Sequence, residues 1–195
     1  MGINLRQTDN SKTPQAGCSG RSAAAGTTGA REMTDGGTAG TSEVIVGIQN
    51  FGTLLYVYND ISDAINETTW DAPSGGDPYT WRLNITTAVA AVTLEEVYFC
   101  RLNSSEVSQE TLASATGIGQ TISSTGVISG NITTGSAATS PSATDKLAVI
   151  YVFTNTNEHG GDEVFGITPN QLIDTPIIRT GVSESNSNQL LLGVG

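Results

Sequence analysis

The apolar residues of this chain are grouped in short runs of strand length, and no other feature of the sequence constrains its fold as strongly. Trp81, Leu83 and Ile85 alternate with polar residues, a pattern typical of a strand that is buried on one face. Residues 147–153 are apolar on both faces, which predicts a strand in the centre of a sheet or against another subunit. Residues 104–115 are polar and fit either a short helical turn or a loop. No stretch sets helix-forming residues around an apolar stripe, so we predict an all-β protein.

Turn-forming residues between the apolar runs predict how the strands connect. We expect strands 44–48 and 53–58 to be joined by a tight turn, and 118–122 and 127–132 to form a hairpin. Pro176 has no backbone N–H to donate, so the last strand is expected at the edge of a sheet. About eight short strands fit two packed sheets. The predicted fold class is therefore a jelly-roll-like antiparallel β-sandwich with an extended, largely irregular N-terminal arm.

The N-terminal fifth of the sequence differs from the rest. We divide the chain into an arm at 1–42, a β-sandwich body at 43–181 and a C-terminal tail at 182–195. After Ile3 and Leu5, the only large apolar residue of the arm is Met33, so the arm cannot form a core. Ordering a residue costs about 1 kcal/mol of backbone entropy, which contacts must offset. We expect the arm to lie along the surface of another chain, with a flexible tail as the alternative.

The charge distribution separates the same two regions. The arm has four Lys/Arg and three Asp/Glu, a net charge of +1, whereas the remainder has four and sixteen, a net charge of −12. The total of −11 argues against binding to nucleic acid or to an anionic membrane. An arm of this kind would dock on an acidic partner. The candidate contact residues of the arm are Ile3, Leu5, Arg6, Lys12, Arg21, Arg31 and Met33.

The apolar residues of the predicted body strands form the second candidate set. They alternate along strands, so they face a core or a subunit interface, and we expect the body to trimerise through such an apolar face. The set consists of Trp81, Leu83, Ile85, Val97, Phe99, Leu147, Val149, Tyr151 and Phe153.

The sequence lacks the residues that common catalytic and cofactor sites require. His159 is the only histidine and lies in a Gly-rich turn, so no Ser-His-Asp or Cys-His arrangement can be proposed. No phosphate loop or dinucleotide fingerprint occurs. We therefore expect that the chain is not an enzyme and that it holds no cofactor or metal. Acidic residues near Asp60 and near Asp162 resemble calcium loops, but solvated acidic loops are the simpler interpretation.

Cysteines and aromatic residues allow further interpretations. Cys18 lies in the Gly/Ser-rich arm and Cys100 beside an apolar strand, so we do not expect them to be paired, and Cys100 is most simply a small core residue. Trp70, Tyr79 and Trp81 flank a Pro/Gly loop and could stack on sugar rings, although core packing is the simpler role for Trp81. No N-terminal apolar run has the length of a signal peptide, so export by that route is not expected.

Three strand segments resemble jelly-roll structural proteins of tailed phages, and specifically capsid decoration (cement) proteins. The segments are YTWRLNIT at 79–86, VYFCRLNS at 97–104 and DKLAVIYVFTN at 145–155. The resemblance covers roughly residues 70–178 and excludes the arm. It implies a homotrimer on the outer surface of the virion, made in the host cytoplasm, that clamps neighbouring major capsid proteins and needs no small-molecule ligand. The alternatives are a host-recognition module, such as a tail fibre or spike head that binds glycans, and a secreted carbohydrate-active enzyme.

Overall fold

The structure, a computed structural model, describes residues 2–15, 18, 26–48, 56–156 and 162–179. Within these ranges it contains strands and no helix, so the predicted all-β class is confirmed. The strands are β1 (Gly2–Ser11), β2 (Gly26–Asp35), β3 (Val44–Ile48), β4 (Tyr56–Ser62), β5 (Tyr79–Thr87), β6 (Val92–Leu102), β7 (Ser108–Thr121), β8 (Gly126–Ile132), β9 (Lys146–Asn155), β10 (Glu163–Thr168) and β11 (Leu172–Ile178). No described helix is long and apolar enough to cross a lipid bilayer.

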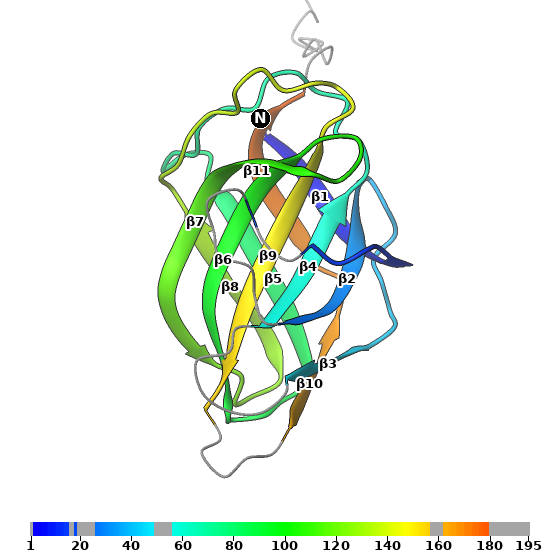
Figure 1. Cartoon of the computed structure of the whole chain (residues 1–195), viewed down its shortest axis with the longest axis vertical. Helices are drawn as coiled ribbons and strands as arrows, with labels where there is room; N and C mark the ends of the chain where they lie inside the picture. The colour runs from blue at the N-terminus through cyan, green and yellow to red at the C-terminus, as the bar shows by residue number, and fades with distance from the viewer. Residues whose placement is uncertain (1, 16–17, 19–25, 49–55, 157–161, 180–195) are drawn as a thin grey trace, which may run out of the picture.

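The strands form one mixed sheet that folds into two layers (Figure 1). The strand order is β3-β10-β5-β11-β1-β2-β4-β9-β6-β7, and β8 pairs with β5 outside this path. β2, β4, β9, β6 and β7 make the front layer in Figure 1, and β5, β8 and β10 lie behind it. Only the β2–β4 pair is parallel among the described strand pairs; the others are antiparallel. β11 and β1 connect the two layers into one hydrogen-bonded sheet.

Most apolar side chains lie in a core between the two layers. All nine residues of the second candidate set belong to this core, so they pack within one chain rather than against another subunit. Strand β9 is buried on both faces, as its sequence predicted, because Leu147 and Tyr151 face the main core while Ile150 and Val152 face a second cluster on the opposite side. The members of that second cluster are Cys18, Ala30, Val57, Ile61, Cys100, Leu102, Ala148, Ile150 and Val152.

The segment that follows β1 covers the outer face of this front layer. Gln15 donates its backbone N–H to Asn59 Oδ1 at 2.7 Å, and Asn59 Nδ2 donates to the Gln15 carbonyl at 3.1 Å. A disulfide joins Cys18 to Cys100 on β6, with the two Cα atoms 5.9 Å apart. The prediction that the two cysteines are unpaired is therefore wrong. Sequence context could not show that β1 carries Cys18 back across the sheet to Cys100.

The prediction of an arm on a partner surface is wrong for the part of residues 1–42 that the structure describes. β1 lies between β11 and β2, and Ile3, Leu5 and Met33 are only 3%, 1% and 0% exposed in the chain's own core. Backbone hydrogen bonds on both sides of β1 compensate for its few apolar side chains, so no partner is needed to order it.

The charged residues proposed for the arm also contact their own chain. Arg6 donates to the Asn170 carbonyl at 3.1 Å, and Arg31 donates to Ser11 Oγ at 3.0 Å. Lys12 forms ion pairs with Glu32 and Asp63, described below. Arg21 lies outside the described residues, as does the tail at 182–195.

Three predicted connections differ from the structure because neighbouring strands in sequence lie in different layers. β3 pairs with β10 and β4 with β2 and β9, so the first predicted pair does not form. β7 pairs with β6 and β8 with β5, so residues 118–132 are not a hairpin ladder. β11 lies inside the sheet rather than at an edge, and Pro176 falls where its register with β1 shifts. Residues 108–115, for which the sequence fits either a short helical turn or a loop, belong to β7.

The position of Leu5 in the main core predicts a stability effect that a surface arm would not show. We expect Leu5→Ala to lower the free energy of unfolding by about 2–4 kcal/mol, because it removes a fully buried side chain and leaves a cavity. The control Ile45→Ala, at a side chain that is 56% exposed, should change it by less than about 0.5 kcal/mol. Urea denaturation followed by tryptophan fluorescence measures both. Equal, small effects would contradict the placement of β1 in the core.

Candidate functional site

The candidate site is a recess of about 570 Å³ at one end of the sandwich. Strand directions explain its location. β2 and β4 are parallel, so both end there, while β1 runs antiparallel to β2 and begins there. β11 is antiparallel to β1 and also ends at this place, just before Arg179. Four chain segments that are far apart in the sequence therefore meet around one hollow.

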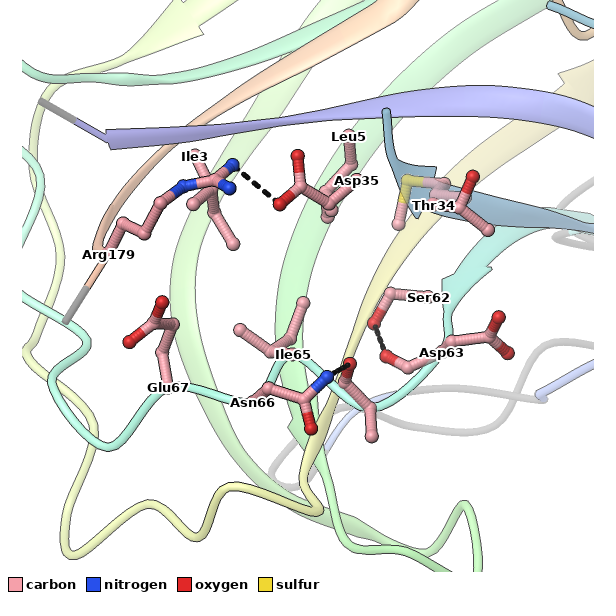
Figure 2. A pocket seen from close by; sticks show the side chains of 12 residues that line it. Ile3, Leu5, Thr34, Asp35, Ser62, Asp63, Ile65, Asn66, Glu67 and Arg179 are labelled. Atoms are coloured by element: carbon pink, nitrogen blue, oxygen red, sulfur yellow. Dashed lines mark hydrogen bonds and ion pairs between the residues drawn. The ribbon is translucent and has the colours of Figure 1, made fainter. Parts of the chain in front are cut away.

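The floor of the recess is apolar and its rim is polar. Ile3, Leu5 and Met33 contribute apolar surface from β1 and β2, and Ile65 contributes it from the segment after β4. In Figure 2, Ile65 lies across the recess from Ile3 and Leu5. The remaining lining residues are Thr34, Asp35, Ser62, Asp63, Ala64, Asn66, Glu67 and Arg179. An apolar group surrounded by hydrogen-bond donors would fit this combination.

The charges on the rim are mostly negative. Arg179 Nη2 lies 2.5 Å from Asp35 Oδ2, and the two side chains face each other along one side of the recess in Figure 2. Asp63 is paired with Lys12 at 2.8 Å, and Lys12 also lies 3.1 Å from a Glu32 oxygen. The rim thus presents three carboxylates, those of Asp35, Asp63 and Glu67, and one guanidinium. This balance favours a partner with a basic group beside its apolar part.

The segment 63–67 is held firmly in place, so one wall of the recess is preformed. Ile65 and Asn66 donate their backbone N–H groups to the carbonyls of Asp145 and Ala143, each at 2.9 Å. Asn66 has a left-handed backbone with φ of 60°. The Asp145 carboxylate in turn pairs with Arg101 at 2.6 Å. A recess with fixed walls needs little reorganisation when it binds a partner.

A carboxyl group is buried on β4, the strand whose last residue, Ser62, lines the recess. Asp60 precedes Ser62 on β4 and is fully buried between the layers. Its oxygens accept hydrogen bonds from Gln7 Nε2 at 2.6 Å and from the Tyr58 hydroxyl at 3.1 Å. Burial raises the pKa of Asp60 to about 7, although the hydrogen bonds from Gln7, Tyr58 and Tyr151 oppose this effect. The sequence pattern predicts Asp60 in an acidic loop, and this prediction is wrong because Asp60 belongs to β4.

The structure does not assemble the other candidate sites of the sequence. Trp70 and Trp81 are 2% and 4% exposed, and Tyr79 is fully buried, so these rings belong to the core and cannot stack on a glycan. Among the described residues, no group of three or more His, Cys, Asp or Glu could hold a metal ion. His159 lies outside the described residues. The recess itself was missed, because its lining comes from four separate segments that no sequence pattern connects.

The raised pKa of Asp60 predicts a pH dependence of stability. The carboxyl group titrates near pH 4 in the unfolded chain and near pH 7 in the folded one, so between these values the folded state binds more protons. The free energy of unfolding should therefore fall by up to about 4 kcal/mol as the pH rises from about 4 to about 7. Asp60→Asn should remove this slope, whereas Asp77→Asn in an exposed turn should keep it. Urea denaturation at a series of pH values measures the slope, and an unchanged slope in Asp60→Asn would contradict the assignment.

Two solved structures show a distant likeness to this chain. No protein-family model and no curated protein sequence matches the chain. Two crystal structures of a CocE/NonD family hydrolase from Staphylococcus aureus resemble it with 8% and 7% identity and TM-scores of 0.44 and 0.46. The matches cover 75% and 90% of this chain but only 34% and 37% of the hydrolase chains, so this chain spans about a third of their length.

Both structures are of one protein, which is named as a hydrolase, and the expectation that this chain is not an enzyme is withdrawn. At such low identity the likeness assigns neither an activity nor a catalytic residue to this chain.

Proposed function

We propose that this chain is a structural protein of a phage particle, which binds the exterior of the capsid as an oligomer. The observation that carries the proposal is the disulfide between Cys18 and Cys100. Disulfides persist in oxidising surroundings, which include the surfaces of virions, and are rare in proteins that stay in a reducing cytosol. The bond fastens the segment after β1 to the outer face of the front layer. A particle protein that must survive outside a cell gains from such a covalent link.

The mode of binding differs from the clamp that the sequence suggested. β1 and β2 are integral strands, so they are not available to run over neighbouring subunits. The recess replaces them as the proposed contact with a major capsid protein. Its apolar floor would accept an apolar side chain of the capsid protein, and its acidic rim would pair with a basic residue beside it.

The disulfide predicts a stability effect and a chemical signature. Protein that is purified without reductant and then unfolded should not react with iodoacetamide, because both thiols are consumed in the bond. Replacing both cysteines by serine should lower the free energy of unfolding by about 2–4 kcal/mol. Mass spectrometry and urea denaturation measure these effects. Alkylation of both thiols in protein recovered from particles would contradict the proposal, because the disulfide is its main evidence.

The capsid role predicts where the chain is found and which residues bind. An antibody against the chain should label the heads of density-purified particles in electron microscopy. The charge reversal Asp35→Lys with Asp63→Lys should weaken co-sedimentation with capsids by at least about tenfold, since it inverts the rim of the recess. Asp71→Lys with Asp77→Lys makes the same change in net charge in an exposed loop and serves as the control. Absence of the chain from particles, or equal loss in both variants, would refute the proposal.

A further inference from the structure

One long stretch of this acidic protein has no charge at all. Residues 111–144 contain no Asp, Glu, Lys, Arg or His, although the whole chain has a net charge of −11. The stretch includes most of β7 and all of β8. These two strands lie on the same side of the molecule in Figure 1, one at the border of each layer. The two strand edges on this side therefore carry no charge along residues 111–121 and 126–132.

The edge of β7 carries features that block further pairing. The loop after β8 covers its first half, since Ser136 donates its backbone N–H to the Leu112 carbonyl at 2.8 Å. In its second half, Gly117 and Gly119 have left-handed φ values of 66° and 62°, and the register with β6 shifts at Glu96. Irregularities of this kind bend a strand and hinder the addition of another one.

Beyond its first residue, Gly126, which has a positive φ of 123°, the edge of β8 carries none of these features. Its pairing with β5 runs without a shift from Tyr79 opposite Ile132 to Ile85 opposite Gly126. No strand among the described residues pairs with its other edge. β8 also lacks the proline, the lysine and the bulge with which proteins protect exposed strand edges.

The two faces of β8 differ. Its inner face packs closely on β5, and the side chains of its outer face are exposed to solvent. Gly130 lies against Trp81 of β5, and a Cβ atom there would come within 2.7 Å of the indole ring, so only glycine fits. On the opposite face Val127 is 54% exposed, and Ser129 and Asn131 are exposed as well. An added strand would find hydrogen-bonding groups at the edge and no charge beside them.

The strand at the other end of the order is a weaker candidate. β3 has five residues and follows Glu43, whose carboxylate accepts hydrogen bonds from Thr86 and Thr87. A carboxylate beside a strand edge opposes association with another acidic surface.

We propose that β8 pairs with β8 of a second copy of this chain, antiparallel and about a two-fold axis. The charge distribution favours a second copy of this chain as the partner of β8. Two molecules that each carry −11 repel each other, and the uncharged stretch is where they can approach with the least repulsion. A two-fold axis places the same strand on both sides of the contact and makes the pair antiparallel, so the two back layers become one continuous sheet. This proposal concerns the isolated chain. Dimerisation can therefore fail while the capsid role holds, and the capsid role can fail while the chain still dimerises.

The test is sedimentation velocity of the purified chain over a range of concentrations. The wild type should sediment as a dimer that dissociates on dilution. The double variant Val127→Lys and Ser129→Lys should raise the dissociation constant at least about tenfold, because the two-fold axis brings the new lysines of both copies together. Ile45→Lys with Val164→Lys, at side chains 56% and 53% exposed on the outer face of β3 and β10, is the matched control and should still dimerise.

Hydrogen exchange supplies a second readout that misfolding cannot imitate. In the wild type, the amides of residues 126–132 should exchange more slowly at high protein concentration than at low concentration. In the Val127→Lys and Ser129→Lys variant, their exchange rates should not depend on concentration. The exchange rates of the β3 amides should be independent of concentration in both proteins. Circular dichroism checks that each variant is folded. A wild type that stays monomeric at every concentration, or a dimer that both lysine variants weaken equally, would overturn the proposal.

Discussion

The structure depends on backbone hydrogen bonding along β1. This strand contributes only a few apolar side chains, yet it pairs with β11 on one side and with β2 on the other. Through it the back layer, which ends in β11, continues into the front layer, which begins with β2. The apolar core is enclosed on this side because β1 joins β11 to β2. A chain segment that looks too polar to fold is therefore the one on which both layers rely.

A second constraint comes from β9, which is apolar on both faces. A strand in a two-layer sandwich normally turns one face to water, but here the outer face needs a cover of its own. The segment after β1 provides it, fixed by the Asn59 side chain and by the bond between Cys18 and Cys100.

Local patterns predicted the strands but not their partners. The alternation around Trp81 and the continuous apolar run of β9 correctly gave a one-sided and a two-sided strand. The low apolar content of residues 1–42 wrongly predicted that β1 lies outside the core, because apolar content takes no account of backbone hydrogen bonds. Sequence adjacency failed for β7 and β8, because strands joined by a short turn went to different layers. The recess and the buried Asp60 escaped prediction for the same reason, since both depend on which distant segments meet.

The pairing of β1 with β11 also sets the order in which the molecule can be completed. Residues 2–6 find their partners at residues 172–178, near the opposite end of the described chain. During synthesis β1 must therefore wait, paired on one side at most, until residues 172–178 have left the ribosome, and such long-range topologies form slowly. The recess also forms late, because both Ile3 and Arg179 line it. Until β11 has joined the sheet, the recess therefore lacks one of its walls.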